Sequence, residues 1–241
     1  MKISLNSLKL LTSLLLILYC KFVNSEQYRS TYWEIYDNEI SAIESKIEQI
    51  LPGYKLLSND EYIQDEKKLL NFMSKDELER RQKRKYLGLL IGNFNKDNYE
   101  DFAAIVINHN NYLDKNIGNS NIRLYSSRLV ICLGGKKVNK FVCDILPTNK
   151  GNYINLPYWI ELHLIKGNGS YIQCGSSEHH TKVYYPENWN GKRPKTGMEE
   201  AESTKIKMDY DVIDESEIGS AAGRSLFRTK NGLYLDCSDK D

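Results

Sequence analysis

The feature that most constrains the fold is the shortness of the connections between apolar runs in the part of the chain that follows Tyr86. Runs rich in valine, isoleucine and tyrosine alternate there with turn residues, which is typical of β-strands. Two connections, Gly167 to Gly169 and Lys230 to Gly232, contain only three residues each. Because a parallel crossover needs a dozen residues or more, these connections predict antiparallel hairpins.

We expect a series of short strands in this region, separated by asparagine, glycine and proline. The predicted strands are Tyr86 to Ile91, Phe102 to Asn108, Arg128 to Leu133, Lys140 to Ile145, Tyr158 to Ile165, Ser170 to Cys174, Lys205 to Ile213, Arg224 to Arg228 and Leu233 to Asp236. The region has no internal sequence period, which excludes a propeller of repeated blades.

Helical patterns precede the strands. Isoleucines recur at steps of three and four residues from Ile40 to Ile50, which predicts a helix that Pro52 ends. A second helical region is expected from about Asp60 to Arg84. Helices followed by strands predict an α+β fold, with N-terminal helices packed on a mainly antiparallel β-sheet in a single domain. Residues 26–85 would form the helical segment and residues 86–241 the β-rich part of the same domain.

The segment from Met1 to Ser25 has the composition of a signal peptide. Lys2 precedes an apolar core from Leu10 to Leu18, and short residues end the segment. A core of about ten residues is too short to span a bilayer, which needs about twenty; the alternative is an uncleaved anchor. Cys20 suggests a lipoprotein, but Tyr19 is too bulky for the usual lipobox. We therefore expect a secreted or periplasmic protein with no transmembrane segment after signal removal.

The charge balance excludes partners that are bound through bulk electrostatics. Lysine and arginine number 33, aspartate and glutamate number 32, and the net charge is +1. Nucleic acids and anionic membranes select strongly basic proteins. We therefore expect no nucleic-acid partner, and a partner that is a protein or a glycan.

An even number of cysteines remains after the signal peptide, which indicates disulfides in an exported chain. They are Cys132, Cys143, Cys174 and Cys237. Cys132 and Cys143 lie on two apolar runs that a hairpin would bring together, and Cys174 would then pair with Cys237. The alternative is four buried thiols that pack as small apolar groups. No pair has the close C-x2-C spacing of a structural zinc site.

The loop from Gly92 to Phe102 is the strongest candidate for a binding site. Oxygen-bearing side chains fall at its first, third, fifth and ninth positions, on Asn93, Asn95, Asp97 and Asp101. Calcium collects oxygen ligands from one short turn at such a spacing. The alternative is an Asx-rich hairpin turn that binds no metal.

This loop resembles the calcium loop of FG-GAP and VCBS-type proteins, in which G-(D/N)-x-N-x-D-(G/N)-x-x-D lies between two apolar strands. The sequence departs from that pattern in two places, since Asn93 replaces an aspartate and Asn98 replaces a glycine. Asn98 can adopt the left-handed conformation of a sharp turn. Asn93 carries no charge, so the resemblance implies a weak calcium site with a dissociation constant of about 10⁻⁴ to 10⁻³ M.

A wider pattern is similar to single-copy VCBS-like secreted proteins without an assigned function. The pattern consists of a helical start, the phrase Leu51 to Tyr54, one loop from Asn93 to Asp101 and a terminal hairpin from Phe227 to Ser238. The resemblance implies the fold and the export of the chain, and it implies no catalytic residues.

A second candidate surface is an aromatic and basic segment that we expect to form a long loop from Tyr184 to Lys195. Its composition is that of a surface that binds sugar, peptide or cell-wall polymer. The candidate binding residues are Tyr184, Tyr185, Trp189, Lys192 and Arg193. The alternative is a loop whose aromatic rings pack back on the sheet.

The sequence indicates no enzyme class. His163 lies within a predicted strand, and Ser176 to His180 lacks the H-E-x-x-H spacing of a metalloprotease. We therefore expect an exported non-enzymatic binding or accessory envelope module. The alternatives are a secreted inhibitor or immunity-like protein that acts on a partner enzyme, and a hydrolase that uses Glu178 to His180.

Overall fold

Strands dominate the part of the chain that the computed structural model describes. The described residues are 37–58, 75, 86–97, 99–117, 120–135, 141–148, 151–155, 160–174, 181–187, 198–201, 204–217 and 223–237. All of them belong to the unit Tyr36–Asp241. The expected signal peptide lies outside the described residues, as does the second helical region except for Lys75.

Helix α2 (Asp37–Ile50) carries the apolar stripe that the sequence predicts. Ile40, Ile43 and Ile47 are each at most 5% exposed, because residues three and four apart share one face of a helix. Beyond the helix, Gly53 adopts a left-handed φ of 81°, and its N–H donates to the carboxylate of Glu48 at 3.2 Å. Within the described residues, no helix has the length and apolar character needed to cross a membrane.

Six antiparallel strands form the first sheet. β1, β3, β4 and β5 are successive neighbours, β2 also pairs with β3, and β6 also pairs with β4. The strands are β1 (Lys55–Leu56), β2 (Leu89–Gly92), β3 (Asp101–Ile117), β4 (Ser120–Leu133), β5 (Val142–Leu146) and β6 (Tyr153–Asn155).

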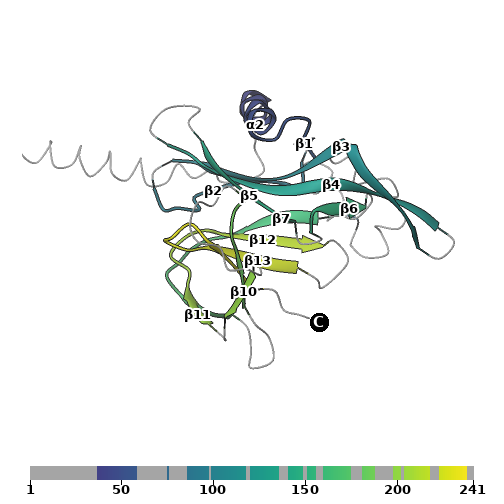
Figure 1. Cartoon of the computed structure of the whole chain (residues 1–241). Helices are drawn as coiled ribbons and strands as arrows, with labels where there is room; N and C mark the ends of the chain where they lie inside the picture. The colour runs from purple at the N-terminus through teal and green to yellow at the C-terminus, as the bar shows by residue number, and fades with distance from the viewer. Residues whose placement is uncertain are drawn as a thin grey trace, which may run out of the picture. The chain divides into compact units, whose positions relative to one another are not determined.

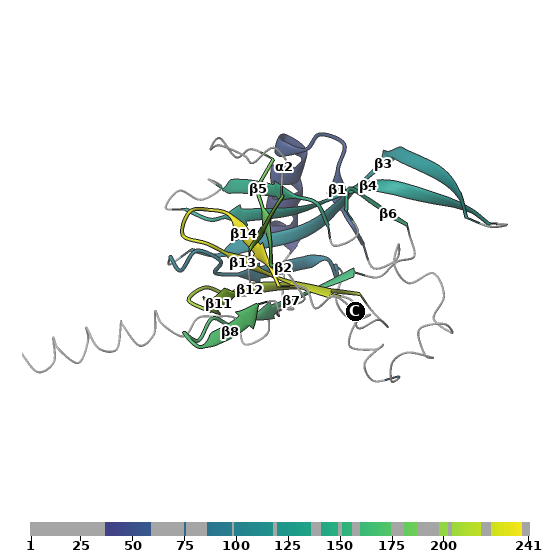
Figure 2. The ribbon, with the colours of Figure 1, turned by 60° about the horizontal axis from the view of Figure 1, so that its bottom comes forward.

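Six further antiparallel strands form the second sheet, in the order β10-β9-β14-β13-β12-β7. The strands are β7 (Ile160–Ile165), β9 (Thr181–Tyr184), β10 (Met198–Ala201), β12 (Val212–Glu217), β13 (Gly223–Arg228) and β14 (Tyr234–Asp236). A separate two-stranded sheet pairs β8 (Tyr171–Cys174) with β11 (Thr204–Lys207), and Figure 2 shows these two strands side by side.

The first sheet is buried on both faces at its centre. Leu90 and Ala103 lie on one face, Leu89 and Ala104 lie on the other, and none of the four has any exposed surface. Figure 1 shows α2 on one side of this sheet and the strands of the second sheet on the other. Backbone contacts join the two sheets, including the N–H of Leu162, which donates to the carbonyl of Leu87 at 3.1 Å.

The expected α+β fold, with N-terminal helices packed on one antiparallel sheet, is wrong. The structure is mainly antiparallel β-sheet with two six-stranded sheets, and α2 is the one helix whose bounds fall within the described residues. A strand's sequence pattern shows that one of its faces is buried. It does not show which other strands share its sheet, so the pattern could not distinguish one large sheet from two that pack together.

The two predicted three-residue hairpins have different outcomes. The connection Lys230 to Gly232 joins β13 to β14, which pair antiparallel as predicted. The predicted hairpin at Gly167 to Gly169 is wrong, because β7 pairs with β12 and β8 pairs with β11. The chain therefore leaves the second sheet at this turn and enters the two-stranded sheet.

Several strand boundaries also differ from the prediction. The predicted strand Lys205 to Ile213 is two strands, β11 and β12, separated at residues 208–211. β3 and β4 extend well beyond their predicted bounds and pair as far as Ile117 with Ser120, so they form a ribbon that continues past the neighbouring strands (Figure 2). The short strands β1, β6, β9 and β10 were not predicted.

The buried centre of the first sheet makes a prediction for Ile105, which has no exposed surface. Replacement by alanine should lower the free energy of unfolding by about 2 to 5 kcal/mol, because apolar burial is lost and a cavity remains. Leu113 lies on the same strand and is 50% exposed, so Leu113→Ala is the matched control, with an expected change within about 0.5 kcal/mol. Urea unfolding measures both values, and equal losses in the two variants would contradict the assignment of this core.

Candidate functional site

The loop from Asn93 to Asp101 is closed by hydrogen bonds from its own side chains. Oδ1 of Asn95 accepts from the backbone N–H of Asp97 at 3.0 Å, and Oδ1 of Asp97 accepts from the N–H of Tyr99 at 2.7 Å. Nδ2 of Asn95 donates to Oδ2 of Asp97 at 2.9 Å, and Nδ2 of Asn93 donates to the carbonyl of Asp97. These contacts are typical of Asx turns, which fold a short segment without regular secondary structure.

Asp101 fixes this loop to a second connection of the first sheet. Its side chain is buried, and its two oxygens accept hydrogen bonds from the N–H of Phe94 at 2.6 Å and the N–H of Gly134 at 2.8 Å. A Cβ at Gly134 would lie 2.3 Å from the carbonyl oxygen of Glu100, so only glycine permits this close approach. Burial raises the pKa of Asp101 to about 6, although the two N–H donors act in the opposite direction.

Two carboxylates of the loop lie within electrostatic reach of each other. The charge of Asp97 contributes to the raised pKa of Asp101, after the larger effect of burial. Carboxylate and amide oxygens are the ligands that calcium prefers, so the donor set of Asn93, Asn95, Asp97 and Asp101 fits a hard cation. The described residues contain no group of three or more acidic, histidine or cysteine side chains that could hold a metal. Two of the four candidate ligands, Asp97 and Asp101, carry charge, and the two asparagines are neutral.

Asp211 connects the same loop to the second sheet. Its Oδ2 accepts from the N–H of Asn93 at 3.1 Å and lies 2.9 Å from Nζ of Lys166. Its Oδ1 accepts from the N–H of Gly167 at 3.1 Å, and its own N–H donates to the carbonyl of Asn93 at 3.2 Å. One carboxylate thus joins the β2–β3 loop, the β7–β8 turn and the start of β12.

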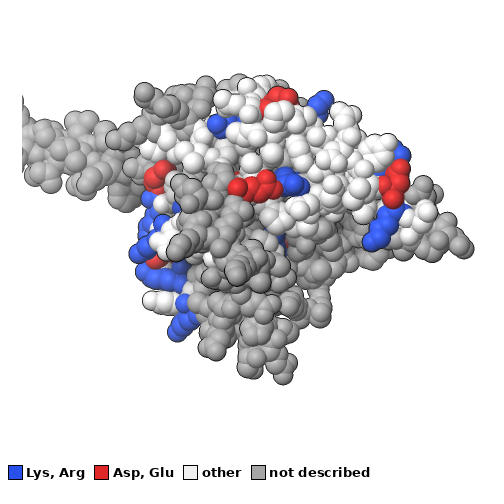
Figure 3. Space-filling model, viewed as in Figure 1, with Lys and Arg blue, Asp and Glu red and all other residues white. Residues whose placement is uncertain are grey.

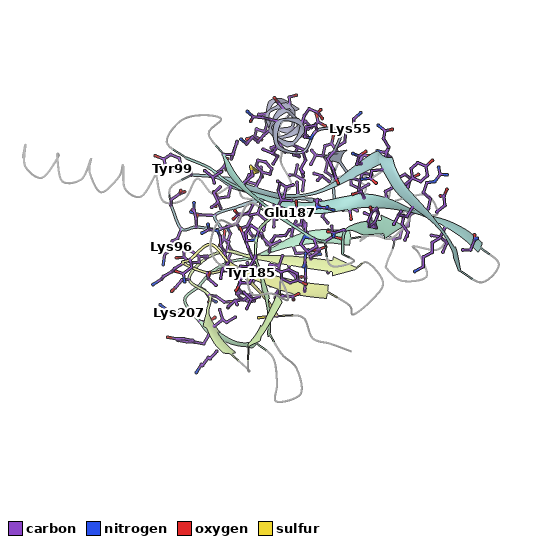
Figure 4. All side chains as sticks on the ribbon, viewed as in Figure 1. Lys55, Lys96, Tyr99, Tyr185, Glu187 and Lys207 are labelled. Carbon is purple, nitrogen blue, oxygen red and sulfur yellow. A yellow bond between two sulfur atoms is a disulfide. The ribbon has the colours of Figure 1, made fainter. Side chains whose placement is uncertain are left out.

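Among the described residues of the loop, Lys96 has a left-handed φ of 59°. The sequence pattern placed a left-handed turn residue at Asn98, which lies outside the described residues. This conformation is sterically unfavourable for Lys96 because of its Cβ. Its side chain is exposed, and Figure 4 labels it on the same edge as Lys207.

The second candidate surface begins within a strand and not within a loop. Tyr184 is the last residue of β9, and its ring lies 5.1 Å from the guanidinium carbon of Arg224. Tyr184 is the direct strand partner of Tyr234, whose hydroxyl reaches Asp144 on β5, so Tyr184 lies on the strand face that is turned toward the first sheet. Burial raises the pKa of Tyr184. Tyr185 is half-buried and is labelled in Figure 4, while Trp189, Lys192 and Arg193 lie outside the described residues.

A buried ion pair lies between the sheets. The sequence patterns did not predict it. Nε and Nη2 of Arg224 lie 2.8 and 2.7 Å from Oε2 of Glu215, and the two side chains are at most 1% exposed. Nη2 of Arg224 also donates to the carbonyl of Pro147 on the first sheet at 2.6 Å. The alternation of each strand provided a signal, because Glu215 shares a face with Ile213 and Arg224 shares one with Leu226.

A second polar contact joins the sheets beside this pair. The hydroxyl of Tyr234, which is fully buried, donates to Oδ2 of Asp144 at 2.8 Å. Nε of Arg228 lies 3.8 Å from the same oxygen. Burial raises the pKa of Asp144, and the Tyr234 hydrogen bond and the Arg228 charge oppose that effect. The carboxyl group is therefore more readily protonated than an exposed aspartate.

The disulfide predicted between Cys132 and Cys143 is present, and it joins directly paired residues of β4 and β5. Cys237 is also disulfide-bonded. The side chain of its predicted partner, Cys174, lies outside the described residues.

The histidines give no catalytic arrangement among the described residues. His163 is on β7, as predicted, with its Nε2 3.5 Å from a carboxylate oxygen of Glu161. His109 makes an edge contact with the ring of Tyr125. The Glu178 to His180 cluster lies outside the described residues, so the hydrolase alternative has no geometry to support it.

Comparisons with known proteins give no relative from which a function could be transferred. No protein-family model, no curated protein and no solved structure matches the chain. The site must therefore be interpreted from its own geometry.

The buried ion pair makes a prediction for stability. Arg224→Met should lower the free energy of unfolding by about 3 to 5 kcal/mol, because it leaves Glu215 buried without its cation. Combining this change with Glu215→Leu should recover most of the loss, since both charges are then absent. The exposed pair Arg123 and Asp114 is the control, and Arg123→Met should cost much less stability than Arg224→Met, because both charges of the exposed pair stay solvated. A double variant as unstable as Arg224→Met would contradict this account.

The raised pKa of Asp144 makes a prediction for the pH dependence of stability. The native protein holds this proton to a higher pH than the unfolded chain, whose aspartate pKa is 3.8. The stability that this group contributes is therefore present below pH 3.8 and is lost as the pH rises through the native pKa. Asp144→Asn should remove that decline in a series of urea unfolding curves.

Asp114 provides a control of opposite sign for this measurement. Its pKa is lowered by the hydrogen bond from Arg123, so Asp114→Asn should remove a contribution that is lost on acidification. If Asp144→Asn gave the pH profile of the wild type, the role assigned to Asp144 would be incorrect.

Proposed function

We propose that the chain is an exported, non-enzymatic binding module whose Asn93 to Asp101 loop is a weak calcium-type site. The observation that carries the proposal is the pair of carboxylates, Asp97 and Asp101, in one loop whose hydrogen bonds reach both sheets. The proposed role of calcium is to stabilise the junction of these connections. The surface that these connections form would thereby be held in place for binding a partner.

The burial of Asp101 gives an energetic reason for a cation at this loop. A buried carboxylate is costly unless it is paired with a cation or hydrogen-bonded. Two backbone N–H groups supply hydrogen bonds to Asp101, while the charge of Asp97 opposes its ionisation. A divalent cation could be held by the carboxylates of Asp97 and Asp101 together with the amide oxygens of Asn93 and Asn95. Both carboxylates would then be attracted to the cation, which outweighs the repulsion between them. The chemistry it supplies is charge neutralisation, and no bond is made or broken.

The disulfide and the described polar residues support export and binding over catalysis. The bond between Cys132 and Cys143 is typical of proteins in oxidising compartments. Two buried charged groups, Glu215 and Arg224, pair with each other in the core. Binding residues are more often found on loops that a rigid scaffold positions, and the sheet connections around Asp211 have that arrangement.

Thermal unfolding in the presence of calcium tests this proposal. A ligand that binds only the native state at ten times its dissociation constant adds about 1.4 kcal/mol of stability, or roughly 3 to 6 °C in melting temperature. We expect this increase at about 10 mM calcium, given the weak affinity of a site with few charges. Asp97→Asn should abolish the increase, because it removes one of the two charged ligands while preserving the side-chain shape.

Two further variants sharpen the measurement. Asn93→Asp adds a third carboxylate, so the same increase in melting temperature should occur at a lower calcium concentration. Asp114→Asn removes an exposed carboxylate of the β3–β4 ribbon and should leave the calcium response unchanged. No response at 10 mM calcium, or an equal response in Asp97→Asn, would refute the site.

A further inference from the structure

Five exposed lysines gather along one edge of the described structure, around the two-stranded sheet and the connections beside it. Figure 3 shows the blue side chains on this edge, and Figure 4 labels two of the residues. The lysines are Lys96 in the β2–β3 loop, Lys166 after β7, Lys205 and Lys207 on β11, and Lys230 in the β13–β14 turn. We call this surface the lysine face.

Aspartates at the centre of the lysine face show that these connections converge. Nζ of Lys207 lies 2.9 Å from Oδ1 of Asp209. The hydrogen bond from Lys207 lowers the pKa of Asp209, and the charges of Lys96 and Lys230 lower it further. Oδ2 of Asp211 lies 2.9 Å from Nζ of Lys166. Lysines from three connections and from β11 therefore lie around the carboxylates of Asp209 and Asp211.

Positive charge exceeds negative charge on this face. The described acidic residues of the same connections are Asp97, Glu100, Asp209 and Asp211, so the five lysines exceed them by one positive charge. Five lysine side chains gathered along one edge attract anions at short range.

An exposed aromatic ring lies among the lysines. Tyr171 on β8 is 60% exposed, and Nζ of Lys205 lies 5.0 Å from the centre of its ring. Tyr171 is the direct strand partner of Lys207, and Lys205 and Lys207 are two residues apart. These three side chains therefore project from one face of the ribbon, with the two lysines about 7 Å apart along the strand.

We propose that the lysine face binds an anionic polysaccharide, whose sulfate or carboxylate groups pair with the lysines while a sugar ring packs against Tyr171. An exposed tyrosine offers a flat apolar surface with a polar tip, which suits a sugar ring. A bilayer would require several apolar side chains to insert, and the described residues next to these lysines include two exposed large apolar side chains, Tyr171 and Ile165. The partner class rests on the proposal that the chain is an exported binding module.

The binding experiment uses the whole mature chain and polymers of defined chemistry. Dextran sulfate and polygalacturonate test sulfate and carboxylate groups, and neutral dextran tests the sugar backbone alone. A single-stranded oligothymidylate and phosphatidylserine vesicles test the two other classes of anionic partner. We expect binding to at least one of the charged polysaccharides, weakening as salt rises because the contacts are ionic, and weaker binding to each of the other probes.

Matched variants assign the binding to this face. Lys205→Gln with Lys207→Gln should weaken polysaccharide binding by about tenfold, since two exposed ionic contacts are lost. Tyr171→Ala should weaken it by a few fold through the lost ring contact. Lys55→Gln with Lys115→Gln removes two exposed lysines of the first sheet and should leave binding unchanged.

The results also separate this inference from the proposed calcium site. Absence of polysaccharide binding, equal loss in the two lysine pairs, no effect of Tyr171→Ala, or tighter binding to the oligonucleotide or the vesicles would each overturn the inference. Thermal unfolding of the same samples with calcium tests the loop independently. A calcium response without polysaccharide binding would refute the lysine face alone, and binding without a calcium response would refute the calcium site alone.

Discussion

The packing of the two six-stranded sheets depends on charged and polar side chains that satisfy one another in the space between them. Arg224 bonds both to Glu215 of its own sheet and to the carbonyl of Pro147 on the other sheet. The Tyr234 hydroxyl makes a second bridge, to Asp144. Apolar burial supplies most of the favourable free energy of such a core. The polar contacts restrict how the sheets can be aligned, because any shift would leave a buried charge without a partner.

Local features of the fold could be predicted from the sequence, and the pairing of distant strands could not. The stripe of α2, the β13–β14 hairpin and the Cys132 to Cys143 bond each depend on residues that lie close together in the chain, so spacing and turn chemistry were sufficient. The Gly167 to Gly169 turn has equally strong hairpin features. Its flanking strands pair elsewhere because distant partners, β12 and β11, are available to them. The number of sheets therefore depends on which distant strands pair with each other.

The candidate loop shows the same division between local and distant information. The spacing of Asn93, Asn95, Asp97 and Asp101 predicted oxygen ligands on one short turn, and calcium binding by that turn remains a proposal. No local pattern predicted that Asp101 would accept a hydrogen bond from Gly134 or that Asp211 would accept one from Asn93. Those contacts cross 33 and 118 residues of the chain. They make the loop a junction of several connections, one of which carries Lys166 of the lysine face.

The disulfide between β4 and β5 has a consequence for the unfolded chain. It closes a segment with a sequence separation of only 11 residues, and it joins residues that face each other in the native register. A one-residue slip of this hairpin would exchange the buried and exposed faces of β5. While the bond is intact, denatured molecules keep Cys132 and Cys143 next to each other, which is the pair that the native register requires. The unfolded chain thus keeps one native residue pair of β4 and β5 in place when its non-covalent contacts are lost.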